Sequence, residues 1–181
     1  MSAPRLLIFD ADGTLRRTTV AGQPCPHAER EWELLPGVAE VLRRLDWGPR
    51  GTMLGVATNQ DHVGYGLLGD ELARRLVRDM VVAACGQLPA RHSLQICPHA
   101  IEAGCECRKP RPGMLLRILD ELGAAPGESL FVGDHEVDEG AARAAGVPFR
   151  WSWEFFRAPP TTPRTRARPR GSRAIRARSR S

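Results

Sequence analysis

The sequence predicts an α/β protein built on a Rossmann-like, doubly wound parallel sheet. Short apolar runs alternate with segments of helical periodicity along most of the chain. Strands that alternate with helices are typical of a parallel sheet whose helices cover both faces. Clusters of polar residues follow the ends of these runs, and open sheets of this kind bind ligands at the carboxyl ends of their strands.

The expected strands are short and apolar, and each expected helix has one apolar face. We expect strands over residues 5–9, 52–57, 93–96, 129–132 and 147–149. We expect helices over residues 36–46, 69–84, 112–122 and 136–145. In the second helix Leu72, Leu76 and Met80 lie on one face. Residues 15–35 contain several Thr, Pro and Gly residues and are expected to be irregular. The stretches between motifs are too short for a separate cap domain.

The net charge of +5 is distributed unevenly along the 181 residues. Residues 158–181 contain eight arginines and no acidic residue, which leaves 18 basic and 21 acidic residues, a balance of −3, in the rest. The low apolar content of this Arg/Pro/Ser-rich tail predicts disorder. Residues 1–157 have the length of one domain. Because this body is mildly acidic, nucleic acid is not an expected partner.

Membrane and secretory segments are not expected. No stretch approaches the roughly 20 apolar residues that span a bilayer. The first residues run directly into an apolar strand, without the basic and long apolar regions of a signal peptide. The five cysteines are an odd number, and three of them cluster with a histidine, which disfavours a disulfide framework. We therefore expect a cytoplasmic protein. We also expect a monomer.

Two carboxylates follow the first expected strand, in the run Phe9-Asp10-Ala11-Asp12-Gly13-Thr14. One carboxylate can attack phosphorus, and the other can protonate the leaving oxygen and later deprotonate water. A cation is then required, because a carboxylate and a phosphate dianion repel each other. The alternative is an acidic turn that only caps local structure.

Further polar residues follow other expected strands. Thr58 can donate a hydrogen bond to a phosphate oxygen. Lys109 is the one lysine in a chain with 25 arginines, which indicates that a compact ammonium is required there. Asn59 is the one asparagine. Asp134 can be a metal ligand, and Asp138 lies one helical turn further on, where a helix also favours an acidic residue.

Together these residues resemble the four motifs of the haloacid dehalogenase superfamily. The motifs correspond to residues 10–14, Thr58, Lys109 and residues 133–138, in the order and spacing of the family. The resemblance spans most of residues 5–150 and implies a Rossmann-like phosphatase, a phosphoric monoester hydrolase.

The resemblance also implies roles for single residues. Asp10 would be the nucleophile and Asp12 the general acid and base. Mg²⁺ would be held by Asp10, the backbone carbonyl of Asp12 and Asp134. Thr58 and Lys109 would neutralise the transferring phosphoryl group. Asn59 and Arg108 are further candidates for binding the substrate, and Arg108 has the alternative of an ordinary surface arginine.

A cysteine-rich segment precedes Lys109 directly. Three thiols and one imidazole suit a closed, tetrahedral structural Zn²⁺ site. The predicted ligands are Cys97, His99, Cys105 and Cys107. The related run Cys25-Pro26-His27 has no second pair nearby, and we expect it to be an irregular loop.

The zinc loop followed by Cys-Arg-Lys-Pro resembles subfamily IIIA of the superfamily. This branch contains D,D-heptose 1,7-bisphosphate phosphatases and histidinol-phosphate phosphatases. Residues 112–115 look more like the heptose enzymes, whereas residues 58–61 and the short gap between His99 and Cys105 look more like the histidinol-phosphate enzymes. A small phosphorylated metabolite, a sugar or polyol phosphate, is the expected substrate. The resemblance to the heptose enzymes is the preferred interpretation, and the histidinol-phosphate enzymes are the alternative.

Two functions of other classes are alternatives. Relatives in the superfamily remove phosphate from polynucleotide 3′ ends, and the arginine tail could contact phosphate backbones. A non-catalytic binding module is disfavoured because all the catalytic residue types are present.

Overall fold

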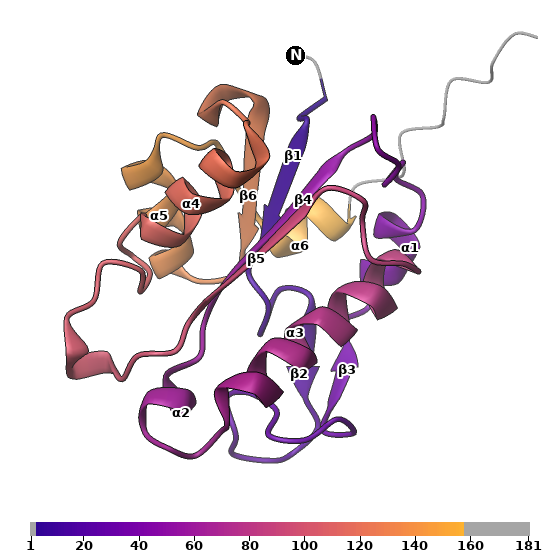
Figure 1. Ribbon diagram of the computed structural model, residues 1–181. Coiled ribbons are helices and arrows are strands. Elements are labelled where there is room, and N and C mark those ends of the chain that lie inside the picture. The colour runs from indigo at the N-terminus through magenta and orange to yellow at the C-terminus, as the bar shows by residue number, and fades with distance from the viewer. Residues whose placement is uncertain (1–2, 158–181) are drawn as a thin grey trace, which may run out of the picture.

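A five-stranded sheet forms the centre of the protein in the computed structural model, which describes residues 3–157 (Figure 1). The strands are β1 (Leu6–Phe9), β4 (Met53–Asn59), β5 (His92–Cys97), β6 (Ser129–Gly133) and β7 (Phe149–Trp151). They lie in the order β5-β4-β1-β6-β7, and every neighbouring pair is parallel. The chain extends the sheet from β1 first in one direction and then in the other. The predicted doubly wound parallel sheet is confirmed.

Helices cover both faces of this sheet, as the sequence predicted (Figure 1). One face carries α1 (Val38–Leu42), α3 (Asp70–Cys85) and the short α6 (Ser152–Arg157). The other carries α4 (Gly113–Leu122) and α5 (Glu136–Ala145). Helix α3 has acidic residues in its first turn and ends at Gly86, whose φ of 80° closes the helix in the left-handed region.

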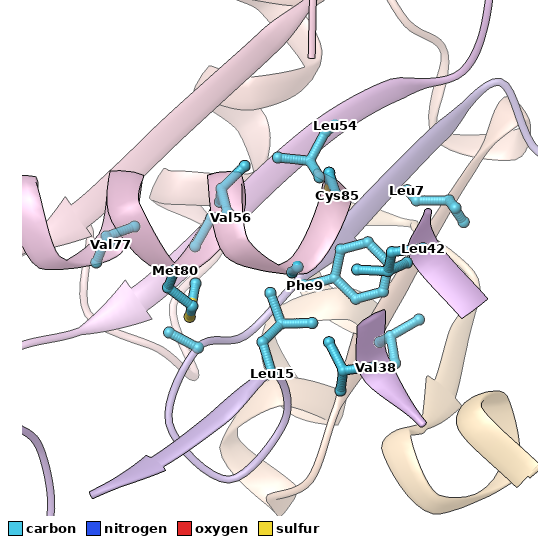
Figure 2. Close-up of a cluster of buried hydrophobic side chains, with 14 of the residues drawn as sticks. Leu7, Phe9, Leu15, Val38, Leu42, Leu54, Val56, Val77, Met80 and Cys85 are labelled. Atoms are coloured by element: carbon cyan, nitrogen blue, oxygen red, sulfur yellow. The ribbon is translucent and has the colours of Figure 1, made fainter. Parts of the chain in front are cut away.

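Strand β1 contributes to two hydrophobic cores because successive side chains of a strand point to opposite faces. Leu7 and Phe9 belong to the core under α1 and α3, and Leu6 and Ile8 belong to the core under α4 and α5. Figure 2 shows the first core, in which side chains from strands and helices are packed together. Buried on both faces, β1 fixes the position of the acidic loop that follows it.

Some sequence predictions of local structure were wrong. Residues 15–35 contain a two-stranded hairpin, β2 (Arg16–Thr18) and β3 (Trp32–Leu34), where we expected irregular chain. Strands of three residues are too short to show an alternating pattern in the sequence. The sequence also did not indicate α2 (Asp61–Gly64), α6 and two 3₁₀ turns, Ile101–Ala103 and Pro126–Glu128.

Residues 3–157 contain no separate cap domain. The hairpin, α2 and the cysteine-rich loop lie at the carboxyl end of the sheet (Figure 1). No helix among the described residues is long and apolar enough to cross a membrane. The predicted disordered tail, residues 158–181, lies outside the part of the chain that the structure describes.

Candidate active site

The predicted acidic and phosphate-binding residues lie at adjacent strand ends. Asp10 follows β1, Thr58 lies near the end of β4, and Asp134 follows β6. Because β1 pairs with both β4 and β6, these three residues meet at one edge of the sheet. The backbone N–H of Asp10 also donates to the carbonyl of Val132, 3.0 Å away, and fixes the start of the loop.

Three carboxylates form the centre of the site. Asp10, Asp134 and Asp138 each offer an oxygen within 4.8 Å of the others. The Thr14 hydroxyl donates to Asp134 Oδ1 at 2.9 Å. Gly13 has a φ of +89°, and a Cβ there would overlap the carboxylate of Asp134, so only glycine allows this close approach. Burial raises the pKa of Asp134, although the bond from Thr14 opposes the shift.

Lys109 is buried between two of these carboxylates. Its Nζ lies 2.5 Å from Asp10 Oδ1 and 2.6 Å from Asp138 Oδ1. The Phe131 ring lies beneath the ammonium, 5.6 Å from centroid to Nζ. Burial alone would lower the pKa of Lys109, but the two carboxylates outweigh burial and raise it. Lys109 is therefore a permanent cation beside Asp10.

Asn59 holds the backbone of Lys109. Its Nδ2 donates to the Lys109 carbonyl at 3.2 Å, and its Oδ1 accepts from the Lys109 N–H at 3.1 Å. Both ends of the Asn59 amide bind the Lys109 backbone. This geometry favours a role for Asn59 in positioning Lys109, instead of the contact with substrate that the sequence suggested.

The pKa of Asp10 is raised, which favours the protonated form of its carboxyl group. Burial raises its pKa from 3.8 to about 7, against the opposing charge of Lys109, while Asp138 adds to the increase. A buried carboxylate with this pKa is only partly ionised at neutral pH. A cation close to Asp10 would favour the ionised form, which is the nucleophilic one.

Asp12 is held by two residues, Arg16 and Gln60, that the sequence did not indicate as part of the site. The guanidinium of Arg16 donates to Asp12 through Nε at 2.8 Å and Nη2 at 3.3 Å. Gln60 Nε2 donates to Asp12 Oδ2 at 2.7 Å. Arg16 is almost fully buried and also binds the carbonyl of Leu76. The spacing of four residues between Asp12 and Arg16 was a weak signal, because most arginines in such spacing are exposed.

Asp138 has two structural functions, where the sequence left its role open. Its Oδ2 accepts from the N–H groups of Asp134 and His135, at 3.2 and 3.1 Å. Its Oδ1 faces Lys109. His135 in turn accepts from the Val137 N–H, so the start of α5 is capped from both sides.

The four residues predicted to bind zinc come together. Cys97 Sγ lies 3.6 Å from His99 Nδ1 and 3.5 Å from Cys105 Sγ. Cys107 Sγ lies 3.2 Å from His99 Nδ1 and 3.4 Å from Cys105 Sγ. A tetrahedral Zn²⁺ site needs S···N and S···S separations of about 3.6 and 3.8 Å. Arg111 donates to the Cys105 carbonyl at 2.6 Å and ties this loop to the segment of Lys109.

The remaining predicted substrate contacts lie at the same end of the sheet. The Thr58 hydroxyl accepts from Gln60 Nε2 at 3.1 Å. The Arg108 guanidinium lies 3.5 Å from Asp61 Oδ1 of α2, with about a fifth of its side chain exposed. Arg108 is therefore largely buried and pairs with an acid of α2.

The parallel α/β fold and the acidic cluster at the carboxyl edge of its sheet are those expected of a phosphatase. A haloacid dehalogenase-like hydrolase family model matches residues 18–146. The chain belongs to the haloacid dehalogenase-like hydrolases, as the resemblance of its motifs predicted.

Relatives and solved structures agree with this assignment. A D-glycero-alpha-D-manno-heptose-1,7-bisphosphate 7-phosphatase of Mycobacterium tuberculosis is 36% identical over 78% of this chain and 75% of its own length. The D-glycero-beta-D-manno-heptose-1,7-bisphosphate 7-phosphatase of Pseudomonas aeruginosa is 34% identical over 77% of this chain and 75% of its own length. A solved structure is that of the D,D-heptose 1,7-bisphosphate phosphatase of B. bronchiseptica, complexed with magnesium and phosphate. It superposes on this chain with a TM-score of 0.67 and 28% identity, and the match covers 80% of this chain and 78% of the other. These relatives give no support to the histidinol-phosphate alternative.

Proposed function

We propose that this protein is a magnesium-dependent phosphomonoesterase that removes the 7-phosphate from a D-glycero-D-manno-heptose 1,7-bisphosphate. The buried contact between Lys109 and Asp10, at the strand end that also carries Asp12, is the observation on which the reaction rests. The names of the relatives from M. tuberculosis and P. aeruginosa support the substrate class. Because one relative acts on the alpha and the other on the beta compound, both anomers belong in the test.

The reaction has two steps on this arrangement. An Asp10 oxygen attacks phosphorus, the bond from phosphorus to the sugar oxygen breaks, and Asp12 gives that oxygen a proton. Asp12 then takes a proton from water, the water oxygen attacks phosphorus, and the Asp10–phosphorus bond breaks to release inorganic phosphate. Lys109 and the Thr58 hydroxyl neutralise the phosphoryl oxygens during both steps.

The acidic cluster fits a magnesium ion. Carboxylate and carbonyl oxygens are the ligands that Mg²⁺ prefers. The ligands would be Asp10, the backbone carbonyl of Asp12 and Asp134. Asp138 is not included, since Lys109 binds its Oδ1 and two backbone N–H groups bind its Oδ2. The ion would offset the repulsion between the Asp10 carboxylate and the phosphate dianion.

The cysteine loop fits a structural zinc ion, because three thiols and one imidazole close a tetrahedral site and leave no position for a substrate. The loop would hold Arg108 and Lys109 in place, with Arg108 reaching a hydroxyl or the second phosphate of the substrate. A catalytic domain over residues 1–157, a cytoplasmic location and a monomeric state remain predictions.

A substrate panel with ³¹P NMR tests the proposal. With Mg²⁺, we expect loss of the C7 phosphate signal from at least one heptose 1,7-bisphosphate anomer, while the C1 phosphate persists. Histidinol phosphate and DNA with a 3′-phosphate are the comparison substrates. Turnover of neither anomer would refute the substrate assignment. Turnover of the DNA that disappears on deletion of residues 158–181 would favour the nucleic-acid alternative.

A further inference from the structure

A second cluster of soft ligands lies apart from the cysteine loop. Cys25 and His27, in the connection between β2 and β3, meet His62 of α2 with all three ligating atoms within 4.8 Å. The sequence predicted only an irregular loop around Cys25 because no second pair of ligands follows nearby. The third ligand comes 35 residues after His27, so the fold and not the spacing brings it there.

One distance in this cluster matches a zinc site, and a second is that of a hydrogen bond. Cys25 Sγ lies 3.6 Å from His62 Nδ1, the separation of about 3.6 Å that Zn–S and Zn–N bonds require in a tetrahedron. His27 Nε2 lies 2.6 Å from the same Nδ1. Two nitrogens bound to the same tetrahedral Zn²⁺ lie about 3.3 Å apart, so the two rings must separate by about 0.7 Å for both to bind one ion, and without an ion a shared proton joins them. Three ligand atoms that converge on one point favour the metal ion.

The local backbone holds the three ligands in place. The His62 carbonyl accepts from the N–H groups of Leu67 and Leu68, at 2.9 and 3.1 Å. The His27 N–H donates to Glu31 Oε2 at 2.8 Å. Cys25 is only 6% exposed. Little conformational entropy is therefore lost when a metal ion binds.

We infer that Cys25, His27 and His62 form a second site for a divalent transition metal, and the thiolate and two imidazoles favour Zn²⁺. Three protein ligands leave one position for water, unlike the closed site of the cysteine loop. The ion would fasten the connection between β2 and β3 onto α2.

Helix α2 also links this cluster to the rest of the active site. Gln60, the residue before α2, binds the Asp12 carboxylate. Gly64 at the other end has no room for a Cβ against the backbone of Ala100 in the cysteine loop. Helix α2 would therefore be held between two metal sites, and Gln60 with it.

The metal content of the full chain tests the inference. We expect two zinc ions per chain after gel filtration, measured by inductively coupled plasma mass spectrometry against protein concentration. His62→Asn and Cys25→Ser should each reduce the content twofold, to one. His92→Asn is the matched control, since this histidine binds the Pro89 carbonyl away from both clusters and should leave two ions. One ion in the wild-type chain, with no loss in His62→Asn, would overturn the inference and leave a proton shared between the two imidazoles.

Cobalt provides a readout that does not depend on a variant folding well. In the wild-type chain loaded with Co²⁺, a tightly bound second equivalent should add visible d–d bands of tetrahedral Co²⁺, with weaker thiolate charge transfer than the first, since it has one sulfur ligand and not three. Saturation of all tetrahedral bands at one equivalent contradicts a second site.

Discussion

The ammonium of Lys109 lies 2.6 Å from Asp138 Oδ1, so the cation that faces Asp10 is itself held by a carboxylate of α5. Both side chains are buried. Removing one member of a buried ion pair leaves an uncompensated charge, which costs more than the pair contributes. The position of Lys109 therefore depends on a residue that the proposed chemistry does not use directly.

The first prediction concerns Asp138→Asn. The neutral amide keeps the shape of the carboxylate but loosens Lys109, and we expect kcat to fall at least about tenfold, the effect of about 1.4 kcal/mol. Glu139→Gln, a neighbouring acid on the exposed face of α5, should leave kcat unchanged. Steady-state kinetics with Mg²⁺ give both values. Equal kcat in Asp138→Asn and wild type would show that Lys109 does not need this anchor.

The second prediction is a pH dependence of stability. Asp10 has a folded-state pKa of about 7 and an ordinary value of 3.8, so the folded state binds the proton more tightly. The free energy of unfolding should fall as the pH rises from about 4 to about 7 and then level off.

Asp10→Asn has no ionisable group at this position. The free energy of unfolding of the variant, relative to that of the wild type, should therefore increase across the same pH range. Thermal melts in magnesium-free buffer measure the difference, with the exposed Asp120→Asn as a control that follows the wild type. Parallel curves for Asp10→Asn and wild type would mean that the Asp10 pKa is near its ordinary value.

The third prediction concerns the guanidinium that orients Asp12. Arg16→Met removes both hydrogen bonds to Asp12, and general acid catalysis contributes about 10²–10⁴-fold to a rate. We expect a large loss of kcat with sugar phosphates, whose leaving oxygen needs a proton. The loss should be much smaller with p-nitrophenyl phosphate, whose leaving group needs none.

Arg17→Met is the matched control, because Arg17 is exposed and pairs with Glu33. It should not change the ratio of the two rates. If Arg16→Met slowed both substrates to the same extent, Arg16 would support the fold and not the proton transfer.

The fourth prediction concerns the cysteine loop. A strong zinc chelator should lower the melting temperature of the wild type and reduce kcat, because the loop leads directly to Lys109. Cys105→Ser should melt lower from the start and lose part of this sensitivity. Cys85→Ser changes a buried cysteine outside both soft-ligand clusters, so it should keep the full chelator effect. An unchanged wild-type melting temperature with chelator would argue against structural zinc.

The sequence was sufficient for the parallel sheet and for the residues at its carboxyl edge. Strand ends of a parallel sheet meet at one edge, so Asp10, Thr58 and Asp134 could be expected together from the order of the elements alone. The four ligands of the cysteine loop lie within a short segment, so their spacing was informative.

Other parts of the site depend on packing between distant segments. Arg16 became a partner of Asp12 because a hairpin buries it, and that hairpin has strands of three residues each. His62 joined Cys25 and His27 only through the placement of α2. No local pattern in the sequence carries such contacts, because they are fixed by the tertiary structure.

The reciprocal bonds between Asn59 and Lys109 join the one asparagine and the one lysine of the chain. Selective ¹⁵N labelling of the side chain of either amino acid would therefore produce a single side-chain nitrogen resonance, located inside the site. Because each of these two amino acids occurs once, a native residue reports on occupancy of the site, and no reporter group has to be introduced.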